Sequence, residues 1–267
     1  MLFLYFKAPF GAFRSFQSIE MSMTADFVTH SAAYGLLLGL AGVPRESKKD
    51  YAGARIALGL KGERLPLHGR AYQQLHWVKL EGRVEKRKGK PPKGETLKAA
   101  FERSKGTKPD IRPYIREFLH GCESYDEVDH DPTGKVSGAR YRLHGFEGYI
   151  GLNDSALEEL VRRGVEEPTT LDYWGLPFMG DNNFFVERLE VSDDPSPCRW
   201  FSLYQGEPLS RGARLHYLSV WTDYEADNES EPRSVSRSGS LPFALTDTKD
   251  SPPDKAWIPV QEFNTKQ

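Results

Sequence analysis

The sequence predicts an α+β fold of the ferredoxin-like kind, related to the RNA-recognition motif. The main observation is the order of the expected elements: strand, helix, strand, strand, basic arm, strand, helix and strand. Two further observations are an apolar helix rich in small residues near the N-terminus and a second helix with a clear capping sequence. With 267 residues the chain is long enough to bury a substantial core.

The first expected element is an aromatic and apolar strand at residues 2–7, followed by a loop at 8–16 that mixes Gly, Pro, three Phe and Arg14. Residues 27–43 then join a polar start to a helix that is apolar on nearly every face. Gly35 and Gly39 lie four apart, and Gly in a helix costs roughly 1 kcal/mol relative to Ala. We therefore expect this helix to pack closely and to be buried under a sheet.

The start of this helix carries Thr29, His30 and Ser31. A helix N-terminus has free backbone N–H groups and a partial positive charge, both of which suit a phosphate. The alternative is that Thr29 or Ser31 only caps the helix and that His30 is an incidental surface residue.

Two strands are expected at 55–60 and 71–80, and a strand pair or hairpin at 139–151. Between them the segment 83–116 holds twelve Lys and Arg against four Asp and Glu, a net charge of +8. Gly and Pro residues interrupt it, which indicates an insertion and not a continuous helix. A concentrated basic arm suits a polyanion, whereas the alternative is a solvated loop that only aids solubility.

The remaining elements follow the arm. A helix is expected at 156–163, capped by Asn153, Asp154 and Ser155 and ended by Gly164. A strand at 184–191 completes the ferredoxin-like order. The C-terminal part offers strands at 199–204, 215–224 and 257–263, and a long mobile loop at 225–254, rich in Ser, Asp, Glu and Pro.

These elements divide the chain into four predicted parts. They are a first part of the ferredoxin-like domain at 1–82, the basic arm at 83–136, the second part of the domain at 137–192 and a β-rich C-terminal region at 193–267.

Two segments resemble a known family. The first is KAPFGAFRSF followed by THSAAYGLLLGLAG, and the second is LDYWGLPFMG at 171–180. Both are similar to the Cas-five family of the RAMP superfamily, whose members belong to type I CRISPR Cascade effector complexes. In that family a first strand leads through a loop to a helix of similar sequence within a ferredoxin-like fold. The basic arm resembles the thumb of the family, which reaches over the guide RNA. The resemblance fades in the arm and the C-terminal region.

The resemblance implies a ribonucleoprotein subunit in antiviral defence. Its partners would be the guide crRNA, whose 5′ handle it holds, the Cas-seven backbone subunits that it caps, the large Cas-eight subunit, and target DNA near the protospacer-adjacent motif. We predict that the RNA-binding residues lie on the first strand, the following loop and helix start, the strand at 71–80 and the arm. They are Lys7, Phe13, Arg14, His30, Ser31, Tyr34, Gln74, Arg87, Lys88, Lys90 and Lys93.

No catalytic, cofactor or metal motif stands out, and Cys122 and Cys198 lack partners at metal-ligand spacing. We expect no cofactor, no metal and no enzymatic activity. The alternatives are a metal-independent endoribonuclease that processes precursor crRNA through a histidine, as in one type I subtype, or a free-standing RNA-binding protein. Against the ribonuclease, His30 stands where that subtype has proline, and its later Lys-His pair has no match here.

The sequence has no uninterrupted run of about 18 apolar residues, the minimum for a membrane helix. The apolar start at residues 1–6 precedes Lys7 and lacks a cleavage signal, so it is expected to be a strand and not a signal peptide. We expect a cytoplasmic protein without a membrane partner.

Overall fold

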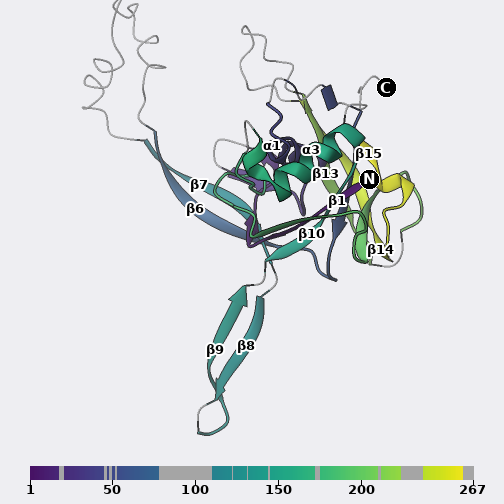
Figure 1. The fold of residues 1–267 in the computed structure, drawn as a ribbon. Helices are drawn as coiled ribbons and strands as arrows, with labels where there is room; N and C mark the ends of the chain where they lie inside the picture. The colour runs from purple at the N-terminus through teal and green to yellow at the C-terminus, as the bar shows by residue number, and fades with distance from the viewer. Residues whose placement is uncertain are drawn as a thin grey trace, which may run out of the picture.

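The computed structural model describes residues 1–17, 21–44, 47, 50–51, 53–77, 110–121, 123–130, 132–143, 145–171, 175–209, 212–223 and 237–260. Its centre is a ferredoxin-like unit in which two helices cover one face of an antiparallel sheet (Figure 1). The strand order β11-β1-β10-β5 corresponds to fourth, first, third and second strand of that fold, as predicted. Its elements are β1 (Leu2–Ala8), α1 (His30–Leu40), β5 (Arg55–Leu60), β10 (Phe146–Asn153), α3 (Ser155–Glu166) and β11 (Arg188–Ser192).

The C-terminal part extends this same sheet beyond β5. The added strands are β12 (Cys198–Leu203), β14 (Arg237–Lys249), β13 (Leu215–Asp223) and the short β15 (Ile258–Pro259). Strand β12 pairs with one end of β5 and β15 with the other, so the β-rich C-terminal region is joined to the ferredoxin-like unit through β5.

The expected loop at 225–254 is wrong for residues 237–249, which form β14. The composition of this segment suggested a loop, because Pro242 and several Ser and Thr residues are unusual in a central strand. The alternation of Leu241, Phe243 and Leu245 instead places Phe243 in the core, and β12 and β13 supply hydrogen-bonding partners on the two sides. Residues 224–236 lie outside the described part of the chain.

A second sheet lies beside the first. It contains β2 (Phe10–Gly11), β3 (Arg14–Gln17), β4 (Met21–Thr24), β6 (Leu67–Trp77) and β7 (Asp110–His120). A separate hairpin of β8 (Glu123–His130) and β9 (Val136–Leu143) projects away from the body (Figure 1).

Strands β6 and β7 form a long antiparallel ribbon, paired from Leu67 with His120 to Trp77 with Asp110. The chain leaves the ribbon at residue 77 and returns at residue 110, directly opposite. The segment between these points, which includes residues 83–109 of the predicted basic arm, lies outside the described residues.

Several predicted boundaries need correction. The strand expected at 71–80 begins at Leu67 and belongs to the second sheet. The pair expected at 139–151 is not a hairpin, because β9 pairs with β8 whereas β10 pairs with β1 and β5. Strand β11 starts at Arg188 instead of 184, and β15 covers only two residues of the strand expected at 257–263, of which 261–263 are not described.

Each helix starts at a side-chain cap. The Thr29 hydroxyl accepts the Ala32 N–H at 3.2 Å, and the Asp154 carboxylate accepts the Leu157 N–H at 3.0 Å. Helix α3 does not end at Gly164 but runs on to Glu166. It crosses α1 there, because a Cβ on Gly164 would lie 1.8 Å from the Leu40 carbonyl oxygen.

The prediction of close packing at Gly35 and Gly39 is wrong for Gly35 but correct in part for Gly39, whose carbonyl oxygen accepts the Gly175 N–H at 3.2 Å. A Cβ on either residue would meet no described atom within 4 Å, and Gly35 is exposed. The close approach between the two helices comes from α3.

Candidate nucleic-acid interface

The face of a ferredoxin-like sheet that is free of helices often binds RNA through exposed aromatic rings on its central strands. Here Tyr5 and Tyr149 occupy such positions on β1 and β10, with ring centroids 5.6 Å apart. Both are buried, because Phe3, Trp200 and Trp257 pack in the same second core on this face. Since these two rings are buried, bases cannot stack on them.

The two segments that carry the sequence resemblance meet at the second sheet. The Ala12 N–H donates to the Met179 carbonyl at 3.0 Å. Gly180 has a φ of +75°, and a Cβ there would lie 2.2 Å from the Ala12 carbonyl oxygen, so only glycine fits this contact. The loop after residue 175 is thereby held against the loop that follows β1.

An aromatic platform lies at this junction, formed by Phe10, Phe118, Phe184, His120 and Arg116. The ring centroids of Phe10, Phe118 and Phe184 lie 5.7 to 6.0 Å from one another. Arg116, Phe118 and His120 alternate along β7 and so share one face of the sheet. All five side chains are half-buried and therefore keep exposed surface.

Arg116 connects the platform to the loop. Its guanidinium lies 5.7 Å from the Phe184 ring centroid and forms an ion pair with Asp181. Asp181 also accepts the Asn183 N–H at 3.0 Å, which orders the turn before Phe184. Half-buried rings with an adjacent guanidinium can stack on unpaired bases and attract the neighbouring phosphate.

The structure places the predicted RNA-binding residues in different environments. Arg14 is exposed on β3, and Lys7 is half-buried on β1, where its Nζ lies 3.5 Å from Glu187 Oε1. Ser31 is half-buried in the first turn of α1, and Gln74 lies on β6 of the ribbon. The four arm residues are not described: Arg87, Lys88, Lys90 and Lys93.

Three predicted residues are buried, and we remove them from the interface. Phe13 is in the main core, and Tyr34 is buried in α1, where burial raises the pKa of its phenol to about 12. His30 is only 2% exposed, and its ring stacks on Phe243 with centroids 4.9 Å apart.

His30 contradicts the phosphate-binding prediction most directly. Neither ring nitrogen has a hydrogen-bond partner among the described residues, and burial lowers the pKa of the imidazole to about 3. A neutral, enclosed imidazole offers no charge to a phosphate. The alternative, in which Thr29 caps the helix, is correct for Thr29, but His30 is a core residue and not a surface one.

Sequence reasoning missed most of the aromatic platform. Phe10 lies in the first segment that resembles the Cas-five family, and Arg116 is one of the twelve Lys and Arg residues counted in segment 83–116, but neither was selected as a site residue. The alternation of Arg116, Phe118 and His120 on a strand was the available signal. Phe184 could not be paired with Phe10 from sequence, because the contact joins segments about 170 residues apart.

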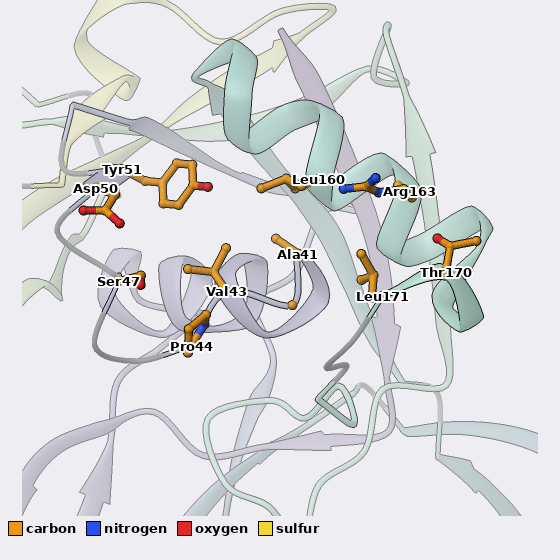
Figure 2. Close-up of a pocket in the computed structure, with 11 residues that line it drawn as sticks. Ala41, Val43, Pro44, Ser47, Asp50, Tyr51, Leu160, Arg163, Thr170 and Leu171 are labelled. Atoms are coloured by element: carbon orange, nitrogen blue, oxygen red, sulfur yellow. The ribbon is translucent and has the colours of Figure 1, made fainter.

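A cavity, a buried thiol and two absences complete the description of the candidate sites. A cavity of about 420 Å³ lies between the end of α1 and α3, lined among others by Tyr51, Leu160 and Arg163 (Figure 2). Burial raises the pKa of the Cys198 thiol to about 12, so it stays protonated. Among the described residues, no group of three or more His, Cys, Asp or Glu side chains could hold a metal ion, and no helix could cross a membrane.

Comparisons with known proteins support the fold. No protein-family model matches the sequence, and no curated protein does. A solved chain described as "CRISPR RNA-guided surveillance complex" is similar in structure, with a TM-score of 0.50 and 12% identity over 92% of this chain and 89% of that one. A second, described as "Crystal structure of Cas protein", has a TM-score of 0.37 and 12% identity over 97% and 95% of the two chains. The first likeness extends over nearly the whole chain and supports the ferredoxin-like fold.

Proposed function

We propose that this protein is a non-catalytic Cas-five-like subunit of a type I CRISPR ribonucleoprotein. It binds the 5′ handle of the guide crRNA and caps the Cas-seven backbone beside the large Cas-eight subunit. Target DNA near the protospacer-adjacent motif passes close to this end of the complex.

The observation that carries the proposal is the position of the aromatic platform. Three of its residues, Arg116, Phe118 and His120, lie at one end of β7, and the basic segment joins the other end of this strand at residue 110. Aromatic stacking and phosphate neutralisation would therefore act on one strand of RNA. Because the aromatic rings on the helix-free face of the first sheet, Tyr5 and Tyr149, are buried, the second sheet is the better candidate for unpaired bases.

The likeness in fold to a chain of an RNA-guided surveillance complex supports an assembly role over a free-standing RNA-binding protein. The two resembling segments support it as well, because they pack against each other beside the platform. A free-standing protein would instead bind unrelated RNA as a monomer.

The platform can be tested with two neighbouring phenylalanines. Replacing Phe184 with Leu keeps apolar volume but removes a ring, and we expect it to raise the Kd for single-stranded handle RNA roughly tenfold, because stacking on one ring contributes about 1–3 kcal/mol per base. Replacing Phe185 with Leu is the matched control, since Phe185 is exposed and is not part of the platform.

Binding would be measured by fluorescence anisotropy at one fixed salt concentration, with melting temperatures to confirm that both variants fold. A wild-type Kd in the Phe184→Leu variant would refute the platform. Equal weakening in both variants would also refute it and would place the RNA on the exposed loop instead.

The non-catalytic assignment predicts that pure protein leaves repeat RNA intact. Metal-independent cleavage at the handle boundary that disappears in a His76→Ala or His144→Ala variant would instead make the endoribonuclease the primary function. His30 is a weaker candidate for such a role because it is buried and unprotonated.

A further inference from the structure

His120 is the last residue of β7 and lies in one row with an apolar residue on each neighbouring strand. Its register partners are Phe10 on β2 and Leu67 on β6. Directly opposed residues on adjacent strands share a face of the sheet, so the three side chains lie side by side. His120 and Phe10 are half-buried and Leu67 is exposed. The row therefore presents one polar ring between two apolar side chains on the accessible face of the platform.

The next row along β7 is kept flat by a glycine. Gly69 on β6 is the register partner of Phe118, and a Cβ on Gly69 would lie 2.5 Å from the Phe118 ring. The ring thus lies across the β6 backbone, in space that any other residue at position 69 would occupy. The centroids of the Phe118 and His120 rings are 6.1 Å apart. A planar base that stacks on Phe118 therefore has one edge beside the imidazole.

The imidazole of His120 is held in one orientation and one tautomer. Its Nδ1 lies 2.9 Å from the carbonyl oxygen of Gly121. A carbonyl oxygen only accepts hydrogen bonds, so Nδ1 carries the proton and donates it. In the neutral ring the other nitrogen, Nε2, then bears a lone pair and is a hydrogen-bond acceptor. Among the described residues, no hydrogen bond to Nε2 is found.

The other side chains of the platform offer a base no acceptor. Three of the five are phenylalanines, and the guanidinium of Arg116 only donates. The carboxylate of Asp181, which borders the platform, is engaged by Arg116 and by the Asn183 N–H. An acceptor at the edge of a stacked base selects a base with a donor there. Adenine and cytosine carry such a donor in their exocyclic amino groups, N6 and N4, whereas uracil has the carbonyl O4 in the corresponding place.

We propose that His120 selects the base that stacks on Phe118. The exocyclic amino group of an adenine or a cytosine donates to His120 Nε2, and Gly69 keeps the space above β6 free for the Phe118 ring. This inference rests on the proposed function, because it requires that the platform binds RNA. It adds to that function a preference for amino-bearing bases at one position.

The test compares an RNA octamer of adenosine with an octamer of purine riboside, which keeps the purine ring and lacks the amino group. We expect the wild-type protein to bind the adenosine octamer roughly three- to tenfold more tightly, the effect of one added hydrogen bond. Fluorescence anisotropy at one fixed salt concentration measures both Kd values, at about pH 8.5, where imidazole is ordinarily neutral.

The His120→Phe variant keeps a ring for stacking and removes the acceptor, so the ratio of its two Kd values should fall to about one. The Tyr217→Phe variant is the matched control, because it removes a polar group from an exposed ring on the first sheet and should keep the wild-type ratio. Melting temperatures show whether the variants fold, and His120→Leu serves if His120→Phe does not.

Equal binding of the two octamers by the wild-type protein would overturn the proposal, as would a wild-type ratio in the variant that lacks the imidazole. Both of these results leave RNA binding by the platform intact and so do not affect the proposed function. Failure of the wild-type protein to bind either octamer would overturn the base selection together with the platform.

Discussion

Replacing His30 with Leu should stabilise the protein, and more so in mild acid. In the part of the chain that the structure describes, no group forms a hydrogen bond with either nitrogen of the buried imidazole, so leucine removes two unsatisfied polar atoms from the core. In addition, the pKa of His30 falls from 6.5 to about 3 on folding. A group whose pKa is lowered in the folded state binds a proton more readily when unfolded, so it costs stability as the pH falls below 6.5.

The size of this effect follows from the shift. At about pH 8 neither state of His30 binds a proton and the linkage contribution is close to zero. At about pH 5 the unfolded state is favoured by about 2 kcal/mol, because each pH unit between the two pKa values contributes about 1.4 kcal/mol. The advantage of His30→Leu over wild type should therefore be about 2 kcal/mol larger at pH 5 than at pH 8.

Urea unfolding followed by tryptophan fluorescence at the two pH values measures this difference. Other titrating groups act equally in both proteins and cancel. Leu152→Ala is the control, since Leu152 lies in the same buried core but carries no proton, and its effect should be the same at both pH values. An equal stability change of His30→Leu at pH 5 and pH 8 would refute the burial of His30 and restore it as a candidate phosphate ligand.

Two other predictions concern packing and charge. Gly164→Ala should lower the free energy of unfolding by roughly 2–3 kcal/mol, because its Cβ would lie 1.8 Å from the Leu40 carbonyl oxygen. Gly35→Ala should raise the free energy of unfolding by about 1 kcal/mol, because no described atom lies within 4 Å of the new Cβ. Urea unfolding checks both, and a stabilising Gly164→Ala would contradict the contact between the two helices. Neutralising the arm should flatten the plot of log affinity for RNA against log salt by roughly one unit per lost phosphate contact, and an unchanged slope would identify the arm as a solvated loop. The arm residues to be replaced with Ser are Arg87, Lys88, Lys90 and Lys93.

The ferredoxin-like unit could be predicted because its signals are local. The apolar β1, the Thr29 cap and the Asp154 cap each show in a few consecutive residues. The second sheet could not be predicted, since it depends on pairings between distant segments such as Gly11 with Leu119. Strand β14 was hidden because its stability comes from two neighbouring strands and not from its own composition.

The candidate site was predictable only in part. Exposed Arg14 and the loop segments were recognisable from residue type and order, but burial was not. His30 at a polar helix start looked accessible, yet β14, which was expected to be a loop, covers it through Phe243. The error in the fold therefore caused the error in the site. The aromatic platform was missed for the related reason that it joins three separate segments.

Purification of the tagged protein together with the products of its neighbouring genes tests the proposed function most directly. We predict a stable complex of several subunits that contains guide RNAs sharing one 5′ end, as identified by sequencing the bound RNA, and partial loss of this RNA in the Phe184→Leu variant. A chain that elutes as a monomer, or that carries a heterogeneous mixture of cellular RNA, would contradict its role as a handle-binding subunit of a CRISPR complex.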